Sequence, residues 1–224
     1  VLFRSEFTKR YQRCGAEAWT DASTFHQEDP SMRVTAWAVV TWREGWVKIA
    51  EGLLEVGAPV SEGELKAIKV AAELGARVIY TDAQAIVSRW ERTSRGYIRS
   101  ASDWDAKLST IPQGTELVWV KGHVPLEEGM DPSARRVAEG SAKADQAARE
   151  LAEKYKPGLE VVQRRKALLS RIAMVQRWQA GIREQKLLSL KRPREESQQV
   201  ERVVKRRVSI TQPELFVEEY PEGL

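Results

Sequence analysis

Four acidic residues stand at positions where a carboxylate needs an explanation: Asp21, Glu64, Asp82 and Asp145. Asp82 directly follows the strand-like run 76–81 and precedes a helix-like pattern, so it could cap that helix by accepting backbone N–H groups. The alternative is that it belongs to a group of carboxylates that the fold brings together for chemistry. The choice depends on where the other three acidic residues lie.

Each of the other three also has an ordinary structural explanation. Asp21 lies inside a strand pattern, where Asp is normally depleted, unless the strand ends sooner and Asp21 opens a turn. Glu64 follows Ser61 by three residues, the spacing of a capping box, but it also lies at the edge of a helix face turned toward the sheet. Asp145 could pair with Arg149 one turn later, although it shares a side with small residues that would let its helix lie close to the sheet.

The elements that must position these residues follow from the hydrophobic pattern. Two Val- and Trp-rich segments, split by Arg43–Glu44, predict a hairpin, and strand and helix patterns alternate after it. The predicted strands are 16–23, 33–42, 45–55, 76–81 and 115–123, and the predicted helices are 61–74, 82–91, 100–111 and 141–155. This order indicates an α/β fold with a mixed five-stranded sheet, three antiparallel strands and then parallel strands, flanked by helices.

Length and composition fit one domain with an extension. The chain has 224 residues, of which 42% are hydrophobic and 30% charged, as is typical of globular proteins. No apolar run approaches the roughly 20 residues of a membrane span, and the start does not resemble a signal peptide. The single cysteine, Cys14, excludes an internal disulfide and a cysteine-rich zinc site, which favours a reducing intracellular setting.

Charge is distributed unevenly along the chain. Residues 1–160 carry 22 Lys/Arg and 24 Asp/Glu, residues 161–210 carry 14 and 4, and residues 211–224 carry none and 4. The change in charge near Pro157–Gly158 predicts a domain boundary there. We therefore expect a leader cut from a longer polypeptide (1–14), a domain (15–156), a basic helical arm (157–190) and a disordered tail (191–224).

The order of motifs resembles the ribonuclease H family over roughly residues 15–155. The motifs are "WTDAS", "SEGELKAI", "YTDAQAIV", "WVKGH" and "EGSAKADQAARE", and the last of them is most similar to the ribonuclease H domains of reverse transcriptases from retroviral or retrotransposon polyproteins. The resemblance implies that Asp21, Glu64, Asp82 and Asp145 are catalytic metal ligands. It also implies that His123, at the start of a mobile loop expected over 124–140, assists proton transfer and product release.

The activity that the resemblance implies is metal-dependent cleavage of the RNA strand of RNA·DNA hybrids. Two Mg²⁺ ions about 4 Å apart, which Mn²⁺ can replace, activate a water and stabilise the leaving oxygen, and Mg²⁺ prefers oxygen ligands. Four carboxylates in one site repel each other when no metal is bound. The family recognises the hybrid by its backbone and 2′-hydroxyls, so Ser23, Gly63 and Gln84 are candidate substrate contacts.

A second class of function stays open, a non-catalytic ribonuclease H-like domain that binds nucleic acid or serves as a scaffold. The presence of all four acidic residues favours the enzyme. The expected partners are the hybrid and the remainder of a reverse transcriptase polyprotein, and no membrane partner is expected.

The basic arm has several interpretations. Apolar residues recur near helical spacing with Arg and Lys between them, so the arm could pack on the domain, bind a partner helix or contact phosphates. Phosphate contacts there would compensate for the short segment 92–99, where some family members carry a basic protrusion. The basic cluster at 191–207 resembles a bipartite nuclear-import signal. We therefore expect the protein in the cytoplasm, in the nucleus or in both.

Overall fold

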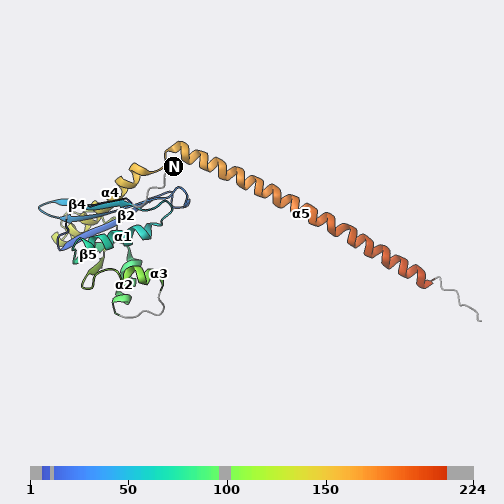
Figure 1. Ribbon diagram of the computed structural model, residues 1–224, viewed down its shortest axis with the longest axis horizontal. Coiled ribbons are helices and arrows are strands. Elements are labelled where there is room, and N and C mark those ends of the chain that lie inside the picture. Colours follow the sequence, from blue (N-terminus) through green and yellow to red (C-terminus); the bar gives the residue numbers. More distant parts are fainter. Residues whose placement is uncertain (1–6, 11–12, 96–101, 211–224) are drawn as a thin grey trace, which may run out of the picture. The chain divides into compact units, whose positions relative to one another are not determined.

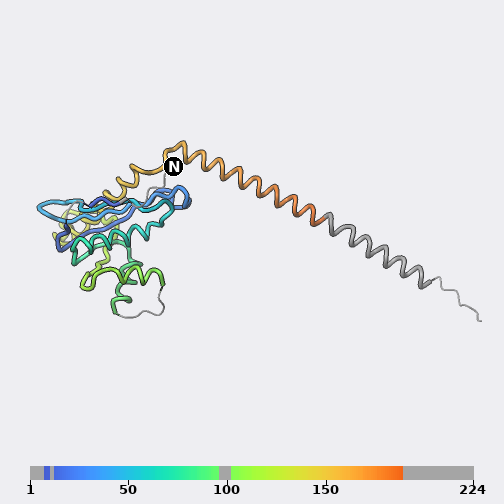
Figure 2. Tube along the Cα trace, in the orientation of Figure 1, coloured from blue at the N-terminus to red at the C-terminus, as the bar shows by residue number. Residues whose placement is uncertain are grey.

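A computed structural model describes residues 7–10, 13–95 and 102–210 of the chain, with side chains for residues 8–10, 13–95 and 102–188 (Figure 2). Its contacts divide the chain into two units, Val1–Gly158 and Leu159–Leu224. Each unit is described by itself.

The described part of the first unit contains a six-stranded mixed sheet in the order β1-β4-β3-β2-β5-β6. The strands β1 to β4 pair antiparallel, whereas β2 with β5 and β5 with β6 pair parallel. The strands are β1 (Phe7–Arg10), β2 (Glu17–Phe25), β3 (Val34–Trp42), β4 (Trp46–Leu53), β5 (Val78–Thr81) and β6 (Glu116–Trp119). The predicted mixed sheet is confirmed.

One strand was not predicted. β1 lies within the segment expected to be a leader, and it pairs with the edge of β4, with Thr8 opposite Gly52. Its sequence, "FTKR", is too short and too polar to indicate a strand by hydrophobic pattern. The strand covers a sheet edge that would otherwise present unpaired backbone groups.

Helices cover both faces of the sheet, with α1 and α4 on opposite sides (Figure 1). The helices of this unit are α1 (Val60–Glu73), α2 (Gln84–Ser94), α3 (Asp103–Leu108) and α4 (Pro132–Tyr155). Successive residues of β2 serve different faces, since Ala18 and Ala22 pack in the core beneath α1, while Trp19 packs with Ala144 and Ala148 of α4.

Glycines let both helices approach the sheet closely. A Cβ on Gly63 of α1 would lie 2.8 Å from the Ala22 Cβ, and one on Gly140 of α4 would lie 2.5 Å from the Trp19 ring. Small side chains on the inward side of α4, among them Ala144 and Ala148, continue this close contact, as the sequence predicted.

The start of α4 differs from the prediction. The helix begins at Pro132, so the expected loop over 124–140 is wrong for its last nine residues. The reason is local, because the Asp131 carboxylate accepts hydrogen bonds from the backbone N–H groups of Ser133 (3.0 Å) and Ala134 (3.1 Å), and Pro132 suits the first helical position.

The described part of the second unit is a single helix, α5 (Leu159–Ile210), of 52 residues. It continues through residues 191–210, the first part of the tail for which disorder is expected from the sequence, and the rest of that tail, 211–224, lies outside the described residues. Residues 182–210 contain no Gly and are rich in Arg, Lys, Glu, Gln and Leu, which favour helix, whereas Pro193 within them opposes it. Among the described helices none is long and apolar enough to cross a membrane.

The contact between Gly140 and Trp19 gives a testable prediction. Gly140→Ala should lower the free energy of unfolding by about 1–3 kcal/mol, because the added methyl group overlaps a buried indole ring. Urea denaturation measures the change. Gly181→Ala is the matched control, since Gly181 also lies in a helix but a Cβ there meets no atom of the described residues within 4 Å. Equal stability of the two variants would contradict the close packing of α4.

Candidate metal centre

Three carboxylates among the described residues converge on one point. Asp21, Glu64 and Asp82 each offer an oxygen, and these oxygens lie within 4.8 Å of one another. They come from the interior of β2, the first half of α1 and the residue that follows β5. The parallel pairing of β2 with β5 sets Thr20 opposite Thr81, so the next residues along the two strands are Asp21 and Asp82.

The capping explanations for Asp82 and Glu64 are wrong. The N-cap of α2 is Ala83, and that of α1 is Pro59, neither of which has a polar side-chain atom. Because α1 begins at Val60, Ser61 lies inside the helix and cannot form the capping box. The Glu64 carboxylate turns to the sheet instead.

The backbone of β2 fixes two of the carboxylates. The N–H of Ala22 donates to Asp21 Oδ1 at 2.7 Å and to Glu64 Oε1 at 3.1 Å. Both acidic residues are only 8% exposed. Within the part of the chain that the structure describes, the buried Glu64 Oε2 has no hydrogen-bond partner. A buried oxygen of this kind is satisfied by a proton, a water or a cation, and an oxygen-only ligand set suits a hard divalent cation.

Burial raises the pKa of all three carboxyl groups, and neighbouring carboxylates add to the rise. The pKa of Asp21 rises from 3.8 to about 7, mainly because burial disfavours its charged form and also because the Asp82 carboxylate is close. Burial, with the charges of Asp21 and Asp82, raises the pKa of Glu64 well above its ordinary value. Burial also raises the pKa of Asp82, and the nearby His123 opposes that rise.

Asp145 and His123 lie at the rim of this cluster. The Asp145 Oδ2 lies 3.9 Å from the His123 Nδ1, and the two side chains are 29% and 80% exposed. Asp145 projects from α4, and its charge contributes to the raised pKa of both Asp21 and Asp82. His123 stands in the turn after β6 with a φ of 53°, a left-handed conformation that is uncommon outside glycine. The structure therefore places Asp145 beside the three-carboxylate cluster and pairs it with His123.

The three candidate substrate contacts lie in different settings. Ser23 is half-buried in β2, and Gln84 is exposed at the first position of α2. Gly63 is buried between α1 and the sheet, so close packing already accounts for a glycine at this position.

Two residues that contact Asp82 were not predicted from the sequence. The indole N–H of Trp119 donates to the Asp82 backbone oxygen at 3.2 Å, and a Cβ on Gly122 would lie 2.5 Å from Asp82 Oδ2. Both residues belong to the quoted "WVKGH" motif, but their sequence positions carry no sign of a contact 37 to 40 residues away. The last residue of β6 thus contacts the backbone of Asp82, and the turn after β6 contacts its carboxylate.

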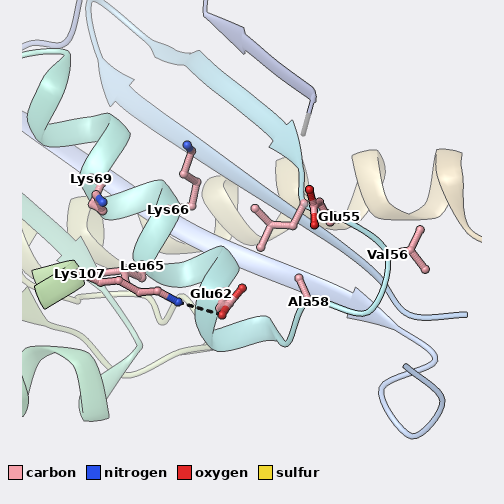
Figure 3. A pocket seen from close by; sticks show the side chains of 9 residues that line it. Glu55, Val56, Ala58, Glu62, Leu65, Lys66, Lys69 and Lys107 are labelled. Carbon is pink, nitrogen blue, oxygen red and sulfur yellow. Dashed lines mark hydrogen bonds and ion pairs between the residues drawn. The ribbon is translucent and has the colours of Figure 1, made fainter. Parts of the chain in front are cut away.

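A separate pocket lies on another side of α1 (Figure 3). It has a volume of about 380 Å³ and is lined by Lys66, Lys69 and Lys107 together with Glu55, Glu62 and apolar residues. Lys107 donates to Glu62 Oε1 at 3.1 Å. Glu62 and Glu64 are two residues apart on the helix and so point to different sides, which separates this pocket from the carboxylate cluster.

No protein-family model matches the sequence, and neither does a curated protein. Among solved structures, the RNase H domain of PFV is 17% identical with a TM-score of 0.43, over 62% of this chain and 94% of that domain. The Prototype Foamy Virus protease-reverse transcriptase is 16% identical with a TM-score of 0.43, over 63% of this chain. RNase H1 from the archaeon Halobacterium salinarum is 22% identical with a TM-score of 0.31, over 60% of this chain and 97% of that protein.

The chain spans about a fifth of the foamy virus protease-reverse transcriptase, 21% of its length. The solved structures to which it is similar include RNase H domains, and its own architecture is a mixed sheet with flanking helices. These likenesses are weak and say nothing about function. The functional proposal rests instead on the geometry of the carboxylates.

The raised pKa of Asp21 predicts how the metal-free protein responds to pH. Folding raises this pKa from 3.8 to about 7, so the folded state holds the proton more tightly than the unfolded state. Stability from this group is therefore greatest below pH 4, falls as the pH rises toward 7, and is level above that. Asp21→Asn has no carboxyl group to titrate and does not lose stability in this way. The free energy of unfolding of this variant, relative to that of the unchanged protein, should therefore increase between pH 4 and 7 by about 1.4 kcal/mol for each unit of the pKa shift.

Urea unfolding with a chelator present, at several pH values, measures this difference. Asp103→Asn, which changes an exposed carboxylate of α3, is the control and should show no such trend. A difference between Asp21→Asn and the unchanged protein that stays constant with pH would contradict the buried, mutually repelling arrangement.

Proposed function

We propose that this chain is a metal-dependent endonuclease that cleaves the RNA strand of RNA·DNA hybrids, as the ribonuclease H domain of a retroelement reverse transcriptase does. The observation that carries the proposal is the convergence of Asp21, Glu64 and Asp82 from three separate elements, with ligand oxygens within 4.8 Å. The hybrid as substrate, and the retroelement origin, follow from the resemblance of the sequence motifs.

Asp21, Glu64 and Asp82 are the residues that would hold a divalent cation, with Asp145 at the rim as a further ligand. The unpartnered Glu64 Oε2 among the described residues supports this assignment, because a cation would satisfy it. When bound, Mg²⁺ supplies an activated water and charge stabilisation for the leaving oxygen of the phosphodiester.

The remaining residues of the site position these ligands and move protons. The Ala22 N–H orients Asp21 and Glu64, and the Trp119 indole holds the Asp82 backbone. Because His123 is 80% exposed and lies beside Asp145, its imidazole can exchange protons between the rim of the site and solvent. Exposed Gln84 and half-buried Ser23 are candidate contacts to the substrate backbone.

The proposal predicts Mg²⁺- or Mn²⁺-dependent cleavage of a labelled hybrid, leaving 5′-phosphate ends on the RNA. Asp82→Asn should lower the cleavage rate by about 10³-fold, since an amide cannot replace an anionic ligand and several kcal/mol of charge stabilisation is lost. His123→Ala should slow cleavage by about 10²-fold without abolishing it.

Asp103→Asn is the control for the loss of one carboxylate and should cleave normally. Full activity of a folded Asp82→Asn variant would falsify the assignment. If the unchanged protein binds hybrid but does not cleave it with either metal, the non-catalytic nucleic-acid-binding alternative is correct.

A metal titration tests the cation site without relying on activity. Mg²⁺ should raise the melting temperature of the unchanged protein at pH 8, because a ligand that binds only the folded state stabilises it. Asp21→Asn should lose most of this increase, whereas Asp103→Asn should keep it. An equal increase in all three proteins would place the bound cation outside the cluster.

A further inference from the structure

Helix α5 exposes a row of large apolar side chains along one side. This row, the α5 stripe, consists of Val161, Leu168, Ile172, Val175, Trp178 and Ile182. Spacings of three, four and seven residues place them on the same side of the helix. Their exposed fractions run from 41% for Ile172 to 68% for Trp178. Arg164 lies on the same side between Val161 and Leu168, so the row is continuous from Leu168 to Ile182. An exposed apolar row on a helix is a feature of surfaces that bind a partner.

The charge within residues 161–183 has a single sign, although Glu160 just before this segment pairs with Arg164 at 2.8 Å. From 161 to 183 the sequence contains six Arg or Lys residues and no acidic residue. Helical spacing places Arg171 and Arg183 beside the stripe, and Lys166 and Arg177 on the opposite side of the helix. A surface complementary to the stripe must therefore be apolar along its middle and acidic at its margins.

We propose that the α5 stripe is a docking site for an acidic partner protein, which lays an amphipathic helix with Asp and Glu at its margins along residues 161–183. Such a helix buries the apolar row and offsets the arginines at the same time. This inference goes beyond the proposed nuclease activity and does not depend on the carboxylate cluster.

Two other occupants fit these observations less well. A second copy of α5 would bring arginines of residues 161–183 against each other, and residues 184–210 are also net basic, with eight Lys/Arg and four Glu. A nucleic-acid backbone would neutralise the arginines but would give the six apolar side chains no apolar surface to bury against.

Fluorescence anisotropy with the full chain tests the proposal. The probe is a labelled helical peptide of about four heptads with Leu and Ile at its core positions and Glu at its flanking positions. A peptide with Lys in place of Glu, and an RNA·DNA hybrid in chelator, serve as comparison ligands. We expect the acidic peptide to bind and the basic peptide not to bind.

Three pairs of substitutions separate the contributions of shape and charge. Ile172→Ser with Val175→Ser, which leaves the net charge unchanged, should weaken binding of the acidic peptide about tenfold and leave hybrid binding unaltered. Arg171→Gln with Arg183→Gln should weaken peptide binding about tenfold at low salt and less at high salt. Lys166→Gln with Arg177→Gln removes the same charge from the opposite side and should change it by less than about threefold.

Several outcomes would overturn the proposal. One is failure of the acidic peptide to bind. Another is that the two Arg/Lys pairs weaken binding of the acidic peptide equally while the serine pair leaves it unchanged. If the serine pair weakens hybrid binding as much as peptide binding, the occupant is nucleic acid. If the full chain sediments as a dimer that the serine pair dissociates, the occupant is a second copy. Where circular dichroism shows that the serine pair has lost helix, the comparison of the two Arg/Lys pairs decides.

Discussion

The parallel pairing of β2 with β5 is the contact on which the rest of the candidate site depends. It sets Thr20 opposite Thr81, and the chain then places a carboxylate at the next position of each strand. Two carboxylates held side by side in a buried setting repel each other, so the surrounding structure must supply donors, protons or cations. The single Ala22 N–H donates to both Asp21 and Glu64. The repulsion that remains must be offset by a group that lies between the carboxylate oxygens.

The helices that complete the site reach it by close packing. α1 approaches through Gly63, whose neighbours are Ala22 and Thr35, and this approach brings Glu64 to the Ala22 N–H. α4 approaches through Gly140 and alanines against Trp19, and it carries Asp145 to the rim. Larger side chains at these contacts would lift the helices and their carboxylates away from the strands. The same small residues are therefore required both for the packing of the helices and for the geometry of the site.

Much of the fold followed from local pattern, and the site followed only in part. The Val- and Trp-rich hairpin, the strand before Asp82 and the helix of Glu64 were predictable because their periodicity is strong. A helix cap and a metal-ligating carboxylate look alike in the local sequence, so the pattern around Asp82 could not distinguish them; the resemblance of the motifs favoured a ligand, and the register of β2 and β5 brings Asp82 beside Asp21. The contacts of Gly122 and Trp119 with Asp82 were also beyond reach, since they depend on the distant pairing of β5 with β6.

Other differences had a sequence signal that was overlooked. Asp131-Pro132-Ser133 is a good helix start, and it explains why α4 begins before the expected boundary. By contrast, β1 has only four residues, and its strand conformation is set by the exposed edge of β4 rather than by its own pattern.

Among the described residues the buried Glu64 Oε2 lacks a hydrogen-bond partner, and the pKa values of Glu64 and Asp21 are raised, which has a consequence for ion uptake. A site that holds protons at neutral pH must release them when a cation enters, because protons and the cation compete for the same oxygens. The apparent affinity for metal would then rise with pH over the range in which these groups titrate. Such an exchange lets the empty site stay folded near neutral pH without leaving three like charges unbalanced in its interior.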